Sequence, residues 1–175
     1  MPKQPIAGYA CPEWGQAMWR DSLLASGLQA SDFQCHHLIP SETIFAACFR
    51  SFFKDLRREG FRPHDFETNG IALPCTEGAA CATRLPLHRG PHPRYSEIVA
   101  QRVASIEHRY RTSGQSNFDA NLRIRWLQKG LKKALSQRKL VPLNRRDPLR
   151  PAASFSYIDQ TAQSISDLID PVSGN

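Results

Sequence analysis

The sequence lacks a long apolar run. No stretch approaches the roughly 18 residues that a membrane-spanning helix needs, and the N-terminus has no uninterrupted apolar core of a secretory signal. Glycine and proline, 10 and 13 of 175 residues, are near average, which excludes collagen-like and wholly disordered chains. We therefore expect one globular domain in the cytoplasm of the producing cell, with no membrane partner and no small-molecule cofactor.

The sequence also lacks any CxxC pair. Its 5 cysteines are an odd number, which argues against a disulfide framework and against a zinc ribbon. We expect reduced, mostly buried thiols. Because Cys75 and Cys81 lie only a loop apart, a bridge between them in an oxidising compartment stays open as an alternative.

Acidic residues are scarce where basic residues gather. The net charge is +7, and residues 121–150 hold ten lysines and arginines against the single acid Asp147. The last 25 residues carry three aspartates and neither lysine nor arginine. Such a field is typical of a protein with a polyanionic partner, nucleic acid first. A solvated basic face, or one that docks an acidic protein, stays as the alternative.

Hydrophobic periodicity predicts a mainly helical chain with short strands. Helices are expected over 13–26, 43–59 and 93–110. A short strand or a loop is expected over 33–39, and a short strand over 71–73 of an otherwise irregular stretch, 61–87. The second helix would start at an N-cap, Ser41, and stop at Gly60. Its buried stripe would comprise Ile44, Phe45, Cys48, Phe49, Phe52, Phe53 and Leu56.

The basic segment begins with an amphipathic helix. Its apolar face consists of Ile124, Leu127, Leu131, Ala134 and Leu135. Its basic face consists of Arg125, Lys129, Lys132 and Lys133. An extended basic arm over 140–151 and a last amphipathic helix over 158–169 are expected to follow.

Four of the 6 histidines form two tight groups, His36-His37 and His88 with His92. Three neutral imidazoles can hold one divalent ion and leave coordination positions open, while a fourth, unligated imidazole can accept a proton from water near neutral pH. Because successive residues of a strand point to opposite sides, His36 and His37 would take different roles. Each group alone is weak evidence for a functional site, since adjacent histidines and an interrupted HxxxH spacing also occur in proteins without such a site.

Asn69-Gly70 lies between the two groups and is a strong turn signal. A turn residue is one interpretation of Asn69. The other is that its amide holds a loop or an imidazole in place.

The combined pattern resembles the AHH nucleases of the HNH/endonuclease VII superfamily. The resemblance covers about residues 33–106 and departs from the family pattern at Cys35, where the family has alanine. It is carried by these residues: His36, His37, Leu38, Ile39, Pro40, Asn69, Gly70, Leu73, Pro74, His88, Gly90, His92 and Tyr95.

The resemblance implies an α+β fold, a mainly helical chain around a small ββα-metal (treble-clef-like) core. It divides the chain into an N-terminal helical extension (1–32), the nuclease core (33–112), and a basic helix and arm with a C-terminal helix (113–175) packed on the core. Tyr95 would serve packing.

The resemblance also implies the site. His36, His88 and His92 would bind one divalent metal ion (Mg²⁺, Mn²⁺, Ni²⁺ or Zn²⁺), His37 would be the general base, and Asn69 an orienting residue. Phosphate contacts would come from a basic set: Arg89, Arg94, Arg125, Lys129, Lys132 and Lys133. For Arg89 and Arg94, which flank the ligands, a plain surface charge is the alternative.

The activity so implied is endonucleolytic hydrolysis of phosphodiester bonds, in DNA rather than RNA and without sequence preference. Many AHH domains are toxin modules of bacterial competition, which implies an effector delivered by a dedicated secretion machine and neutralised by an acidic immunity protein. The rival from another class is a non-catalytic, zinc-stabilised module that binds nucleic acid or protein. Such a closed structural site would use all four clustered histidines.

Overall fold

The computed structural model describes residues 27–137, and the predictions for 13–26, 140–151 and 158–169 lie outside this range. The fold is α+β, as predicted: one small sheet and a set of helices. Short elements come first: η1 (Ala30–Asp32), β1 (Phe33–His37), α2 (Ser41–Phe45), η2 (Ala47–Phe49) and α3 (Arg50–Arg58). The second half contains α4 (Phe66–Asn69), β2 (Gly70–Pro74), α5 (Glu77–Thr83), α6 (Pro93–Thr112) and α7 (Asn117–Ser136).

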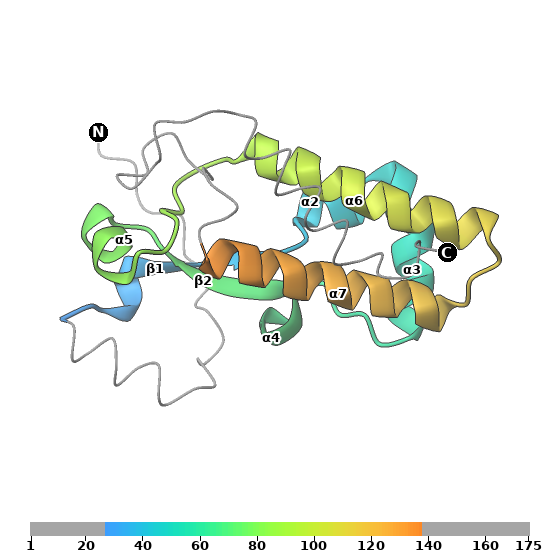
Figure 1. The fold of residues 1–175 in the computed structure, drawn as a ribbon, viewed down its shortest axis with the longest axis horizontal. Helices are drawn as coiled ribbons and strands as arrows, with labels where there is room; N and C mark the ends of the chain where they lie inside the picture. Colours follow the sequence, from blue (N-terminus) through green and yellow to red (C-terminus); the bar gives the residue numbers. More distant parts are fainter. Residues whose placement is uncertain (1–26, 138–175) are drawn as a thin grey trace, which may run out of the picture.

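The two strands form an antiparallel ladder in which His36 lies opposite Ile71 and His37 opposite Gly70. The long helices α6 and α7 run side by side in opposite directions, as Figure 1 shows. The sheet lies toward the end of this helix pair at which α6 begins and α7 ends (Figure 1). This arrangement brings the sheet, the start of α6 and the basic end of α7 to one end of the molecule.

One hydrophobic core joins these elements. The predicted apolar face of α7 is buried, and α7 packs on α3 and α6. The largest fully buried side chains are Phe52, Phe53, Leu38, Ile39, Ile44, Leu56, Leu73, Leu87, Ile124, Leu127, Leu131 and Leu135. None of the helices within 27–137 is long and apolar enough to span a bilayer.

The single helix predicted over 43–59 is wrong. The chain breaks into α2, η2 and α3 because Ala46 adopts φ −57° and ψ 141°, a conformation that no α-helix contains. The break shifts the helical phase, so Phe45 and Cys48 are exposed instead of buried. Ser41 is the first helical residue and its predicted capping position is taken by Pro40.

Two helices were missed between residues 61 and 87. Asp65 caps α4 by accepting a hydrogen bond from the Glu67 amide (3.1 Å), and Thr76 caps α5 at the Ala79 amide (3.3 Å). Both are too short for periodicity to show. The prediction of a turn at Asn69-Gly70 is also wrong. Gly70 is extended (φ −139°) and begins β2 directly after α4 ends at Asn69.

The expected state of the cysteines is partly wrong as well. Cys48, Cys75 and Cys81 are free, so no bridge joins Cys75 to Cys81, but Cys35 is disulfide-bonded. Cys48 and Cys81 are exposed and Cys75 is half-buried.

Candidate metal centre

Three segments far apart in the sequence supply three histidines. His36 comes from β1, His88 from the segment that follows α5, and His92 is the N-cap of α6. The amide of His88 donates to the carbonyl of Pro74 (2.7 Å), which ties this segment to the end of β2. Gly90 turns the chain between His88 and His92 with φ +68°, where glycine is favoured.

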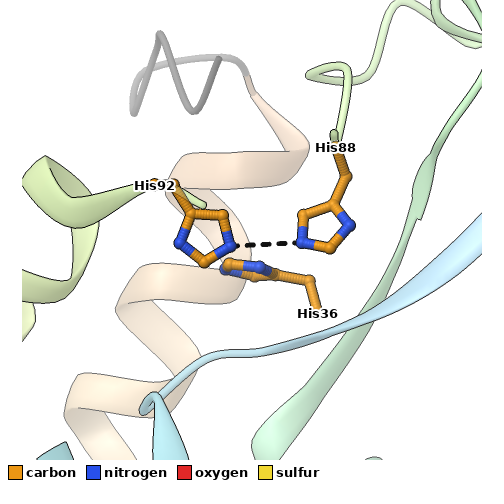
Figure 2. A group of neighbouring side chains, drawn as sticks. All are labelled: His36, His88 and His92. Atoms are coloured by element: carbon orange, nitrogen blue, oxygen red, sulfur yellow. Dashed lines mark hydrogen bonds between the residues drawn. The ribbon is translucent and has the colours of Figure 1, made fainter. Parts of the chain in front are cut away.

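The three imidazoles converge, as Figure 2 shows. The ring of His36 lies 4.9 Å from that of His88 and 4.8 Å from that of His92, and one nitrogen from each ring lies within 4.8 Å of the others. The Nε2 atoms of His88 and His92 are 3.2 Å apart (Figure 2).

This geometry fits a bound divalent ion. Two nitrogens that bind one ion at about 2.0–2.1 Å in tetrahedral geometry lie about 3.3–3.4 Å apart, and the observed His88–His92 separation of 3.2 Å is close to that value. His36 is 2% exposed, and its Nε2 is buried without a hydrogen-bond partner among the described residues. A buried nitrogen without a partner costs free energy that a metal bond would offset. The donor set suits an ion of the zinc type.

The electrostatic environment keeps the triad neutral. Burial is the main cause that lowers the pKa of all three histidines, and it brings that of His88 to about 4 with a further contribution from the charge of His92. A backbone hydrogen bond and, to a smaller extent, the carboxylate of Glu42 act in the opposite direction on the pKa of His92. A neutral imidazole offers the lone pair that a metal needs.

Two further residues support the triad. Gln34 Oε1 lies 3.2 Å from Nδ1 of His88, which selects the ring nitrogen left for a metal. Sequence reasoning missed Gln34, although its place two residues before His36 on a strand puts both on the same side. Tyr95 is buried, with its ring 4.7 Å from His36 and its hydroxyl donating to the carbonyl of Leu38 (2.6 Å), so its contacts are those of a packing residue.

His37 lies apart from the triad. It is half-buried, and its ring is edge-on to His64 at 6.2 Å. Burial lowers the pKa of His37, with a smaller contribution from His64. The expected separation of the two adjacent histidines onto opposite sides of the strand is therefore present in the structure.

Asn69 is fully buried, and its amide makes four hydrogen bonds. Its Oδ1 accepts from the Ile39 amide (2.9 Å) and from Gln128 (3.1 Å), and its Nδ2 donates to the carbonyls of Ile39 (3.1 Å) and Pro63 (2.9 Å). The amide thus holds the chain just beyond the two histidines. Gln128, buried on α7, was missed because nothing in the sequence brings it next to Asn69.

The six basic residues predicted to contact nucleic acid are all exposed. Arg89 pairs with Glu77 (3.6 Å) and Arg94 with Glu97 (2.7 Å) beside the triad. The other four lie on α7, where Lys132 approaches the carbonyl of Glu67 (3.5 Å).

The AHH family, described as a nuclease family of the HNH/ENDO VII superfamily with conserved AHH, matches residues 26–131. The matched range includes the tripeptide Cys35-His36-His37, which has cysteine in place of the alanine of the family's AHH. No curated protein and no solved structure matches the chain.

Proposed function

The chain belongs to the AHH nuclease family of the HNH/ENDO VII superfamily, and from this premise we propose that it is a metal-dependent endonuclease that hydrolyses DNA without sequence preference. The observation that carries the proposal is the separation of the histidines into a converging triad and one imidazole on the other side of β1. A triad with a free neighbour is the arrangement that metal-assisted hydrolysis needs.

His36, His88 and His92 would hold one divalent ion. When bound, such an ion supplies Lewis-acid chemistry, polarising a phosphoryl oxygen and stabilising the charge that develops on the leaving oxygen. The three imidazoles leave coordination positions open. The burial of His36 and the contact of Gln34 with His88 keep these two ligands oriented before substrate arrives.

His37 would be the general base. Because it is half-buried and its side chain is not part of the triad, water can reach its ring without displacing a metal ligand. It would accept the proton of the attacking water.

Asn69 would be a positioning residue. Its bonds to both backbone polar atoms of Ile39 fix the chain two residues beyond His37, so they restrict the direction in which that imidazole points. Gln128 and Pro63 fill the remaining bonds of the amide and lock its orientation.

The basic residues would bind the phosphate backbone. Arg125, Lys129, Lys132 and Lys133 lie on the exposed face of α7, and α7 ends near the sheet that carries His36 and His37 (Figure 1). Contacts of this kind release counterions and give binding that weakens steeply with salt. Arg89 and Arg94 would add phosphate contacts beside the triad.

The biological role that we propose is that of a bacterial antagonistic toxin. It would be made in the cytoplasm of the producing cell and delivered to a target cell by a dedicated secretion machine. The net charge of +7 would suit an acidic immunity protein that covers the site.

The experiment that tests the nuclease adds Mg²⁺, Mn²⁺, Ni²⁺ or Zn²⁺ in turn to metal-stripped protein with supercoiled plasmid, and in parallel with a structured RNA. His37→Ala and His88→Ala are assayed beside the wild type. We expect metal-dependent nicking, a loss of about 10²–10⁴-fold in rate for His37→Ala, and retained metal binding in that variant only. Preference for plasmid over RNA would identify a DNase.

A different set of results would contradict the nuclease and favour the alternative. If no ion supports cleavage, one zinc ion is held tightly, and His37→Ala unfolds, the chain is the zinc-stabilised binding module instead.

A further inference from the structure

A small cluster of exposed rings lies on the His37 side of β1. Phe45, at the end of α2, is 47% exposed, and the ring of the exposed His64 stacks on it at 6.0 Å with an interplanar angle of 26°. The guanidinium of Arg57 on α3 lies over the same phenyl ring, 5.4 Å from its centre. His64 in turn meets His37 edge-on at 6.2 Å. Phe45, His64 and Arg57 do not belong to the metal triad.

We propose that Phe45 and His64 form a stacking surface for a nucleobase next to the phosphate that is cleaved. The inference rests on the proposed nuclease and names the part of its substrate that this surface receives. It predicts that the enzyme contacts bases as well as phosphates, and that it favours strands whose bases can leave the duplex stack.

The exposure of Phe45 has no explanation in the packing of the chain. The sequence periodicity would bury this residue, but the break at Ala46 ends α2 and leaves the phenyl ring in contact with solvent. An exposed aromatic side chain contributes little to the core, and its hydration is unfavourable. A surface ring pair beside a proposed catalytic base is the kind of feature that receives a base, since every nucleobase has a π-face.

The surrounding charges suit a nucleic acid. Arg50, Lys54 and Arg57 recur every three to four residues on α3, and all three are exposed. The one acid of this helix, Asp55, is paired with Arg58 (3.5 Å). A polyanion can therefore follow α3 toward the Phe45 ring, over which the guanidinium of Arg57 lies. An acidic protein could use the charges, but it would not need a stacked ring pair.

The test measures binding, so it does not depend on catalysis. Full-length protein in EDTA, which prevents hydrolysis, is titrated with a fluorescent 12-nucleotide oligothymidine and with a strand of the same length made of abasic sugar-phosphate units. The variants are Phe45→Leu, which keeps an apolar side chain without a π-face, and Phe45→Tyr, which keeps the ring. Phe118→Leu is the matched control, because Phe118 is 64% exposed on the first turn of α7, far from the sheet. Circular dichroism checks the fold of each variant.

We expect Phe45→Leu to weaken binding of oligothymidine about 10-fold or more, and to leave binding of the abasic strand unchanged. Phe45→Tyr and Phe118→Leu should behave like wild type, and His64→Ala should repeat the effect of Phe45→Leu. Equal losses on both strands would reduce Phe45 to a structural residue and overturn the proposal. No loss on either strand would overturn it too and assign the surface to another partner. A wild type that cleaves plasmid but shows no base effect would refute the stacking surface while the nuclease stands.

Discussion

His36 and His37 are neighbours in the chain, yet they occupy different environments. His36 is almost fully buried among His88, His92 and Tyr95, whereas His37 is half-buried and faces the exposed ring of His64. The difference arises from the two-residue period of a strand, which sends successive side chains to opposite sides. One strand can therefore supply a dry ligand on one side and a water-accessible base on the other.

The largest expected difference between the two sides of β1 is in metal affinity, which substitution of His36 should lower and substitution of His37 should not. Loss of one ligand from a three-histidine site should cost about 3–4 kcal/mol, a share of the binding energy typical of protein zinc sites, so His36→Ala should weaken metal binding by several hundred-fold. His37→Ala should bind metal as the wild type does. Isothermal titration of the metal-stripped proteins measures both. Equal losses in the two variants would mean that His37 is a ligand, and the comparison would fail.

The second prediction concerns the residue that fixes the end of β1. Asn69→Ala removes a partner from the Ile39 amide, from the carbonyls of Ile39 and Pro63, and from Gln128, and three of these four hydrogen bonds are fully buried. We expect a loss of about 3–4 kcal/mol in the free energy of unfolding, since each unpaired buried group costs about 1–3 kcal/mol. Urea denaturation measures it. The control is Asn117→Ala, which breaks one hydrogen bond with Tyr110 and should cost about 1 kcal/mol. A similar loss in both variants would refute the anchoring role.

The third prediction concerns how the triad histidines make the stability of the metal-free protein depend on pH. Burial, and then His92, lower the pKa of His88 from 6.5 to about 4, so the unfolded chain binds the proton more readily than the folded chain between these values. The contribution of His88 to the free energy of unfolding is therefore fully present above pH 6.5 and is lost as the pH falls toward 4. His88 alone should contribute on the order of 3 kcal/mol to this fall, and the buried His36 changes stability in the same direction.

Urea denaturation in EDTA at a series of pH values tests this prediction. His88→Gln, which cannot titrate, should flatten the dependence over that window. If the variant and the wild type lose stability with the same pH profile, the imidazole of His88 is not the group that titrates.

The smallest expected effect lies in the turn that joins two ligands. Gly90 has φ +68°, and no atom lies within 4 Å of an added Cβ, so Gly90→Ala meets only backbone strain. It should cost about 1–2 kcal/mol and weaken metal binding slightly. Gly78→Ala in α5 also meets open space, without a positive φ, and should stabilise by up to about 1 kcal/mol. Thermal unfolding compares the two, and a stabilising Gly90→Ala would contradict the turn geometry.

Much of this site could be predicted because its rules are local. The alternation that separates His36 from His37, the helix start at His92 and the two faces of α7 each depend on residues only a few positions apart. The break at Ala46 and the short helices α4 and α5 could not be predicted. They are shorter than the windows over which periodicity is read.

By itself, then, the sequence determined which residues could meet: a pair of adjacent histidines, a second pair four residues apart, and amphipathic helices to cover a core. Only the tertiary structure decided that β1, the segment after α5 and the start of α6 bring three imidazoles within bonding range of one ion. It also decided that Asn69 bonds to Ile39 and Gln128, and that Phe45 faces solvent. The reason is that strand register and helix packing couple positions 30 to 60 residues apart, a distance over which local preferences carry no information.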